Sequence, residues 1–241
     1  GSISAYGDVN VIGYSTGGSG IYLTNGSVTS SNGSIFLSGA TSSATSTYYG
    51  IYSSLINATA SNGSVSFQGA KLDTATTLVN AAGNASAGLP SPYYAISDSA
   101  NMASANTTGV SWTGNVTANT ATGYISINSK APSITGILTS YGLALIGNNQ
   151  SYTLNNASNN FKALAANIGT GTLTVTTTNT LAVGSYNGTD GITAATVTLS
   201  AGGLTGSKNI TATNASTISI TNTSGSYDYS GVVAGPVAIT K

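Results

Sequence analysis

The sequence has very few charged residues and lacks glutamate, arginine and histidine altogether. Charged side chains make up 4% of its 241 residues, whereas about 25% is usual for a soluble domain. Binding to nucleic acid or to an anionic membrane surface needs clustered lysine or arginine, so neither is an expected partner of a chain with zero net charge. The charged residues are Asp8, Asp73, Asp98, Asp190, Asp228, Lys71, Lys130, Lys162, Lys208 and Lys241.

Cysteine is also absent, which removes disulfides, thiolate metal sites and cysteine nucleophiles. Without histidine, Ser-His-Asp and Cys-His mechanisms are excluded. No run approaches the roughly 18 apolar residues of a membrane-spanning helix, and the first residues do not show the basic and then apolar stretches of a secretory signal. We expect no membrane insertion in this segment and, if the protein is exported, a processed or excised piece.

The aspartates form no pattern that indicates catalysis or metal binding. Enzymes that cleave polysaccharides need paired carboxylates, or a basic proton acceptor with acidic metal ligands. Asp190 lies in "NGTDGI", where it favours a turn beside Gly191, and Asp228 between two tyrosines fits a solvated strand or loop. The "STGGSG" stretch at 15–20 lacks the lysine and the helix of a phosphate loop. We therefore expect no enzyme, with no catalytic, cofactor-binding or metal-binding residue and no cofactor.

Glycine, serine, threonine and asparagine dominate what is present, and one phrase built from them occurs twice. "SNGSIFLSGA" fills residues 31–40 and "SNGSVSFQGA" fills 61–70, which defines a 30-residue repeat. The same offset relates "GIY" at Gly20 to "GIY" at Gly50, and weaker copies begin at Tyr93 ("YYAISDSAN") and Gly123 ("GYISINSKA"). Repetition with a period of 20–50 residues is typical of stacked units that share one core.

The C-terminal half shows short alternating strands and a shorter period. Two apolar series recur with a period of about 19 residues, which predicts that each series stacks on one inner face of a coil. We therefore predict an all-β fold, a parallel β-helix (β-solenoid) of roughly nine to thirteen coils, from the chain length and periods of about 19 to 27 residues. The chain forms one segment, 1–241, with larger coils over about 1–130 and regular coils over about 142–222. The two series, which form the expected core ladder, are Leu154, Leu173, Ile192 and Ile210, and Leu181, Leu199 and Ile218.

The repeated phrase predicts a corner followed by an inward-facing strand. Asparagine and glycine tolerate positive φ, which suggests that Asn-Gly turns the chain in "SNGSI" and "SNGSV". The apolar residues of the following strand then face the core; they are Ile35, Leu37, Val65 and Phe67.

These repeats resemble a known group of proteins. Residues 142–203, "GLALIGNNQSYTLNNASNNFKALAANIGTGTLTVTTTNTLAVGSYNGTDGITAATVTLSAGG", together with the earlier "GIY" and "NGSI" units that precede Lys71, resemble the repeats of bacterial exoproteins of the filamentous haemagglutinin type. These are exported by two-partner secretion or autotransporter routes. The resemblance implies a right-handed parallel β-helix, an extracellular or cell-surface location, and a role as an adhesin shaft or biofilm matrix fibre.

Alternatives remain open on the sequence alone. Asn-x-Ser/Thr triplets can accept glycans, which together with the low charge would fit a heavily N-glycosylated surface filament of an archaeon or bacterium that assembles by strand addition. "LTVTTTNT" resembles one rank of an ice-binding solenoid, although threonine suits any solvated strand face, and a polysaccharide-active β-helix enzyme is a further alternative. The thirteen acceptor asparagines are Asn25, Asn32, Asn57, Asn62, Asn84, Asn106, Asn115, Asn149, Asn156, Asn187, Asn209, Asn214 and Asn222.

Two further features concern partners. Tyrosines cluster at Tyr48-Tyr49, Tyr93-Tyr94 and Tyr227/Tyr229, where they either cover the edges of the solenoid or stack on a surface carbohydrate. The chain begins and ends on repeat-like sequence with few charges to block strand pairing. We therefore expect further coils of the same chain, or other copies of it, as partners in a fibre.

Overall fold

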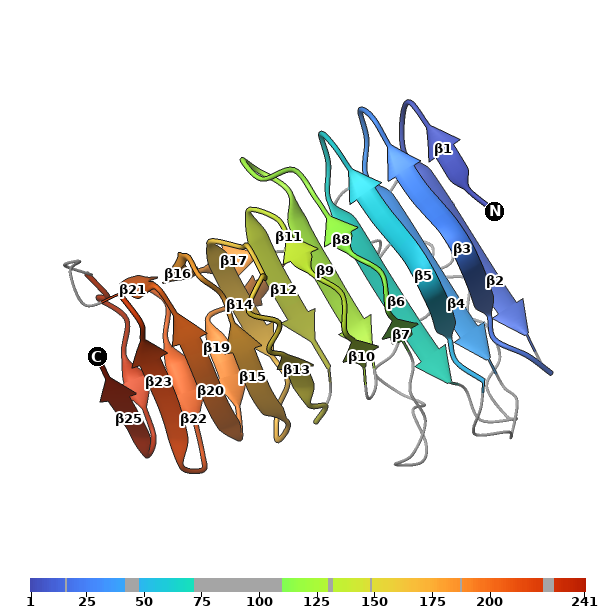
Figure 1. Ribbon diagram of the computed structural model, residues 1–241. Coiled ribbons are helices and arrows are strands. Elements are labelled where there is room, and N and C mark those ends of the chain that lie inside the picture. The colour runs from blue at the N-terminus through green and yellow to red at the C-terminus, as the bar shows by residue number, and fades with distance from the viewer. Residues whose placement is uncertain are drawn as a thin grey trace.

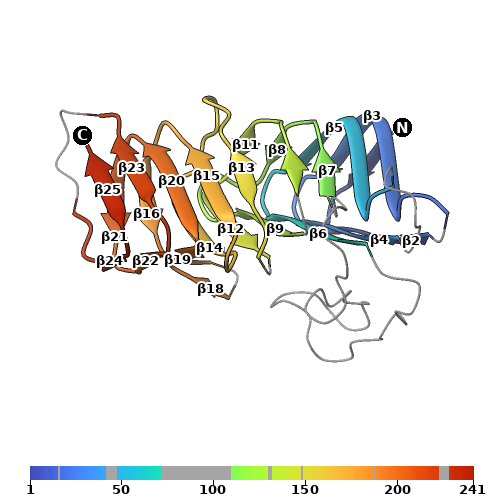
Figure 2. The ribbon, with the colours of Figure 1, turned by 90° about the horizontal axis from the view of Figure 1, so that it is seen from below.

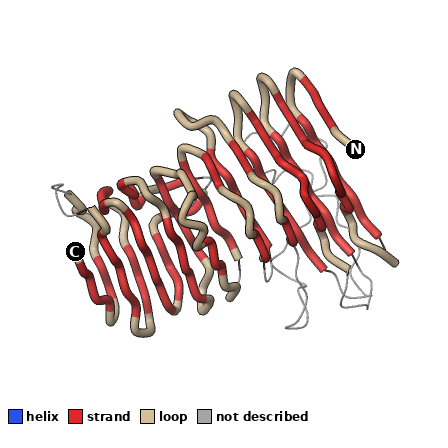
Figure 3. The backbone as a smooth tube through the Cα atoms, viewed as in Figure 1, coloured by secondary structure: helices blue, strands red, loops and turns tan. Residues whose placement is uncertain are grey.

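The computed structural model describes residues 1–15, 17–41, 48–71, 110–129, 132–147, 149–186, 188–222 and 228–241. Regular structure in these ranges is β-strand, wound as a coil whose two termini lie at opposite ends of the stack (Figures 1 and 3). Within the same ranges no helix is long and apolar enough to cross a membrane.

Apart from one short antiparallel hairpin, the strands form three sheets in which every pairing is parallel. Sheets A and C lie along one side of the coil and sheet B along the other (Figure 2). Sheet A contains β1 (Ile3–Ala5), β3 (Ile21–Ser30), β5 (Ile51–Ala60), β7 (Val110–Trp112), β8 (Val116–Thr117), β10 (Ser133–Ile134) and β11 (Leu138–Thr139). Sheet C contains β13 (Tyr152–Leu154), β15 (Thr172–Thr176), β20 (Thr196–Ala201), β23 (Ser216–Ile220) and β25 (Val237–Thr240).

Sheet B runs the length of the molecule and marks its turns. Its main path joins nine strands, one from each of nine successive turns of the described chain, which lies within the predicted range. These strands are β2 (Val9–Ser15), β4 (Ile35–Thr41), β6 (Val65–Lys71), β9 (Tyr124–Ser129), β12 (Gly142–Ile146), β14 (Ala163–Asn167), β19 (Ile192–Ala194), β22 (Ile210–Ala212) and β24 (Val233–Ala234). Two more strands of sheet B pair beside this path, β16 (Thr180–Val183) and β21 (Gly203–Gly206).

The 30-residue repeat places each copy directly on the one before. Ile21 pairs with Ile51 and Ile35 with Val65, so both halves of the repeat stack in register. Strand β6 then pairs directly with β9, where Val65 lies beside Ile125. The copy at Gly123 is therefore the next neighbour in the sheet, whereas the weaker copy at Tyr93 lies outside the described residues.

The core consists of columns of apolar side chains that run along the coil axis. The inward residues predicted for the repeated phrase are confirmed, because Ile35, Leu37, Val65 and Phe67 are each at most 2% exposed. One column continues through five turns in successive pairings, Ile35, Val65, Ile125, Leu143 and Leu164. Parallel strands buried in this way need apolar residues at every inward position, which explains why valine, isoleucine and leucine persist there.

The predicted stacking of the C-terminal ladder is wrong, although all seven of its residues are buried. Leu173 in sheet C pairs with Tyr152 and Val197, whereas Ile192 lies in sheet B beside Ile210. The four residues of the first series therefore occupy two sheets, Leu154 and Leu173 in sheet C, Ile192 and Ile210 in sheet B. The second series is divided as well, with Leu181 in sheet B and Leu199 and Ile218 in sheet C.

A hairpin inserted into one turn explains this error. Strands β17 (Ser185–Tyr186) and β18 (Thr189–Asp190) pair antiparallel and separate β16 from β19. On strand β14, Leu164 pairs with Val183, which precedes the hairpin, but Ala166 pairs with Ile192, which follows it. Because the hairpin lengthens this turn, residues about 19 positions apart along the chain lie in different sheets in this region.

The corner formed by the repeated phrase has a different cause from the one predicted. Gly33 and Gly63 are not among the residues with positive φ. Instead, a Cβ on Gly63 would lie less than 3.0 Å from the carbonyl oxygen of Gly33, and one on Gly123 would lie equally close to Gly63. Glycine is needed here because successive turns pass within backbone contact.

Candidate functional site

A groove opens between sheets A and C, where the strand pairing along that side of the coil is interrupted. Strand β10 pairs with β7, and β13 pairs with β15, but within the described residues no ladder joins β10 to β13. A cavity of about 350 Å³ lies at this junction. Its lining is Pro132, Ser133, Ile134, Thr135, Gly136, Thr153, Leu154, Asn155, Asn156 and Asn159.

Asn159 replaces part of the missing strand pairing. Its Oδ1 accepts a hydrogen bond from the backbone N–H of Leu138 at 2.9 Å, and its Nδ2 donates to the carbonyl of Leu154 at 3.1 Å. The side chain is 1% exposed, and a buried amide is stable only with both halves hydrogen-bonded. Asn159 therefore joins one turn to the next beneath the groove, which is lined by amides, hydroxyls and apolar groups suited to a neutral polar ligand.

Tyrosines form a second feature, a column on the outer face of sheet A. The 30-residue register pairs Tyr22 with Tyr52, and their rings stack with centroids 5.0 Å apart. Tyr49 stacks on Tyr52 from the preceding loop at 5.4 Å. Tyr22 is 66% exposed, so its ring offers an accessible aromatic face.

The sequence pointed to only part of this column. The sequence predicts a local cluster of Tyr48 and Tyr49, whereas the stacking partner of Tyr49 is Tyr52, and Tyr22 is not part of the predicted cluster. The signal was present in the "GIY" repeat, because residues at the same repeat position become neighbours across a parallel ladder. Tyr93, Tyr94 and Tyr227 lie outside the described residues.

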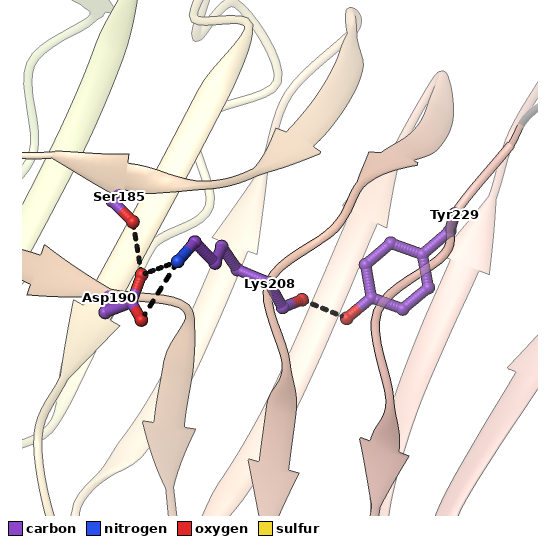
Figure 4. A network of polar contacts seen from close by, with 4 residues as sticks. All are labelled: Ser185, Asp190, Lys208 and Tyr229. Atoms are coloured by element: carbon purple, nitrogen blue, oxygen red, sulfur yellow. Dashed lines mark hydrogen bonds and ion pairs between the residues drawn. The ribbon is translucent and has the colours of Figure 1, made fainter.

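Two charged residues, Asp190 and Lys208, form an ion pair beside the β17–β18 hairpin. Ser185 donates a hydrogen bond to Oδ1 of Asp190, and Lys208 Nζ lies 3.0 Å from the same oxygen (Figure 4). These two contacts, the hydrogen bond from Ser185 first, hold the pKa of Asp190 below its ordinary value. Both charged side chains are largely exposed, 64% for Asp190 and 43% for Lys208. The turn predicted at Asp190 is displaced: Asp190 is the last residue of strand β18, and the residues with left-handed backbone are Gly188 before the strand and Gly191 after it, with φ values of 76° and 65°.

Two tyrosines pack near this hairpin and stabilise its base. Tyr229 donates its hydroxyl to the carbonyl of Lys208 at 2.5 Å (Figure 4). Tyr186 meets Tyr141 edge to face, with ring centroids 6.3 Å apart. Burial raises the pKa of both Tyr186 and Tyr229 above 10.0, and for Tyr186 the neighbouring Tyr141 adds to the rise. These contacts anchor the hairpin and its neighbouring turn.

The predicted glycan acceptors lie mainly on corners and outer faces. Asn84, Asn106 and Asn187 are outside the described residues, and of the other ten only Asn156 is half-buried. Several have structural roles through Oδ1, which accepts a backbone N–H of the next turn: Asn57 from Asn115, Asn115 from Ile137, Asn149 from Thr170 and Asn209 from Val232. The remaining exposed acceptors are Asn25, Asn32, Asn62, Asn214 and Asn222.

No cluster of three or more acidic, cysteine or histidine side chains that could hold a metal ion occurs in the described residues. Comparison of the chain with protein-family models, curated proteins and solved structures finds no match. The class of the protein therefore follows from its architecture: it is a parallel β-solenoid built from repeated turns.

Proposed function

We propose that the chain is a structural and adhesive fibre segment of a large bacterial surface or secreted exoprotein of the filamentous haemagglutinin type. In this role it is extracellular or attached to the cell surface and serves cell adhesion or a biofilm matrix. The observation that carries the proposal is the nine-strand path of sheet B, in which each turn adds the same parallel contacts to the one before. Stacked units of this kind extend a rod by repetition of one interface.

The exposure of the apolar columns supports other copies of the chain as partners, because the columns are covered in the middle turns and exposed at Ile3 and Ile239. Ile239 continues the column of Leu199 and Ile218 in successive pairings. It is 53% exposed, whereas Leu199 and Ile218 are at most 1% exposed. At the other end Ile3 pairs with the buried Val28 and is 36% exposed. The proposed partners are other copies of the chain, whose strands add at these turns and cover the exposed residues.

Sedimentation tests the fibre part of the proposal. The purified chain should associate as its concentration rises, and Ile239→Lys should prevent this, because a lysine at the open column obstructs strand addition. Leu55→Lys is the matched control, since Leu55 is 69% exposed on the side of the coil, and it should associate as the unaltered chain does. A chain that stays monomeric at high concentration, or equal association of both variants, would contradict the proposal.

Binding measurements test the adhesive part. The tyrosine column of Tyr22, Tyr52 and Tyr49 offers stacked rings to a sugar ring, for which aromatic faces are suited. Binding to an array of surface carbohydrates, lost in Tyr22→Ala and kept in Leu55→Lys, is the expected result. Binding unaffected by Tyr22→Ala would remove the tyrosine column from the site, and a complete absence of binding to glycans and to cells would contradict an adhesive role.

A second candidate is a subunit of a heavily N-glycosylated surface filament, favoured by the exposure of nine of the ten described acceptor asparagines. In this case native material should carry hexoses on these exposed asparagines. Intact-mass spectrometry distinguishes the two candidates. A mass equal to that of the bare polypeptide favours the plain exoprotein segment.

A further inference from the structure

The outer face of sheet C carries an ordered array of threonines. Along β15 and β20 the buried residues alternate with hydroxyl-bearing residues that face outward, as side chains do on a half-buried strand. The inward residues Leu173, Val175 and Leu199 are at most 1% exposed. The sequence showed one rank, "LTVTTTNT", and the structure places further ranks beside it.

The register aligns these residues into columns that cross the strands. One column consists of Thr153, Thr174, Thr198 and Thr217, each paired with the next. A second column beside it joins Thr176, Ser200, Ser219 and Thr240. On the other side Thr172 pairs with Thr196. Hydroxyl groups therefore repeat in two directions over the five strands of sheet C.

The geometry of parallel strands sets the spacing of this array. Neighbouring strands lie about 4.7–4.9 Å apart, and successive outward residues on one strand are about 6.6 Å apart. Oxygen atoms on a prism face of hexagonal ice repeat in two perpendicular directions at distances close to these. Threonine has a restricted χ1 angle, so each hydroxyl and methyl group keeps a defined position, and the array can hold water in an ice-like arrangement.

The charge of this face fits the same partner. None of the chain's aspartates or lysines lies in a strand of sheet C. An ionised side chain would hold its own hydration shell and disturb an ordered water layer, whereas an uncharged face matches the uncharged surface of a crystal of water. Figure 2 shows the strands of sheet C side by side in one row on the side of the coil.

We propose that the outer face of sheet C binds ice through the threonine columns. This activity goes beyond the fibre and would anchor it to frozen surfaces or limit the growth of ice crystals around it. It does not depend on the open columns at the ends or on the tyrosines. A failure of the ice experiment therefore leaves the fibre proposal unchanged.

The test measures thermal hysteresis and inhibition of ice recrystallisation by the purified chain. Thr198→Lys, at the centre of the array, should reduce both activities at least tenfold. Thr193→Lys is the matched control, because Thr193 is an exposed threonine paired with Thr211 on the outer face of sheet B, and it should keep the activity. Circular dichroism of each variant checks that it is folded.

If Thr198→Lys fails to fold, the pair Thr174→Ser and Thr198→Ser replaces it. These changes keep the hydroxyl and remove the methyl group, and we expect them to lower the activity while the fold remains. The proposal is overturned if the unaltered chain affects ice no more than serum albumin does, or if Thr193→Lys loses activity to the same degree as Thr198→Lys. In that case the threonines serve only as strand formers on a solvated face.

Discussion

Gly63 lies on Gly33 with no room for a side chain between the two turns: a Cβ on Gly63 would stand less than 3.0 Å from backbone atoms of Gly33. This contact explains why "SNGS" occurs twice. The serines of the same phrase join the turns, because Ser34 Oγ accepts the N–H of Ser64 at 3.1 Å and Ser64 Oγ accepts that of Tyr124 at 3.1 Å.

Gly63→Ala should therefore destabilise the fold. The added methyl group meets backbone atoms of Gly33 in the preceding turn, and overpacking of this kind typically costs about 1–3 kcal/mol. Gly7→Ala is the control, because a Cβ on Gly7 meets no atom within 4 Å. Urea unfolding of both variants measures the difference. Equal stability of the two variants would show that the turns separate at the corner without cost.

Asn159→Ala should be among the most damaging single changes in the described chain. It leaves the N–H of Leu138 and the carbonyl of Leu154 without their partner beneath the groove, and each unsatisfied buried group costs about 1–3 kcal/mol. Asn167→Ala, at an exposed position on β14, should stay within about 0.5 kcal/mol of the unaltered protein. Thermal and urea unfolding give both values, and a loss at Asn159 no larger than at Asn167 would mean that water replaces the amide.

The single tryptophan provides a third prediction. Trp112 is fully buried and packs against Phe67 with ring centroids 4.8 Å apart, but its Nε1–H has no partner among the described residues. Trp112→Ala should cost about 3–5 kcal/mol through the cavity that it leaves. Trp112→Phe should cost much less, because it keeps an aromatic ring and removes the unpaired N–H.

Far-UV circular dichroism during urea unfolding compares these two tryptophan variants. In the unaltered chain, Trp112 fluorescence should be blue-shifted and resistant to acrylamide, and should shift to the red on unfolding. An equal cost of the Phe and Ala variants would indicate that the N–H of Trp112 has a hydrogen-bond partner that matters.

The sequence predicted the architecture because a parallel coil makes repetition visible. In the two copies of the repeated phrase, Ile35 and Val65 occupy the same position and become neighbours without any change of spacing. In the C-terminal half the spacing between neighbours varies, since Val175 and Leu199 are further apart along the chain than Ile192 and Ile210. Sequence intervals count loop residues as well as strand residues, so loops of unequal length conceal the register.

The candidate sites were less predictable for a related reason. The tyrosine column and the threonine columns consist of residues that meet only across the ladder, so they become visible once the register is known. The groove depends on a pairing that fails between β10 and β13, and nothing in the alternation of Ile134 or Leu154 marks such a break. The network at Asp190 unites a hairpin with Lys208 of the next turn, and only the turn itself had a local signal.

Ser185 and Lys208 both lower the pKa of Asp190. The hydrogen bond from Ser185 is the largest single cause of its lowered pKa, and Lys208 lowers the pKa further through a hydrogen bond and through its charge. Ser185→Ala and Lys208→Met should therefore each raise the pKa of the Asp190 carboxyl toward 3.8. Carboxyl ¹³C NMR titration measures both, with the resonance assigned from Asp190→Asn. Ser207→Ala, at an exposed neighbouring serine, is the control and should leave the pKa unchanged.

The lowered pKa of Asp190 also determines how the stability of the folded chain depends on pH. Because the pKa of Asp190 is lower in the folded chain than in the unfolded chain, its ionised form contributes stability above about pH 4, and this contribution is lost as the pH falls through the folded pKa. The side chains are exposed, so the contribution is small. The difference in stability between the unaltered chain and Asp190→Asn should shrink on acidification over this range, as measured by urea unfolding at a series of pH values. A difference that grows on acidification would mean that the folded chain favours the protonated carboxyl, contrary to the geometry around Ser185 and Lys208.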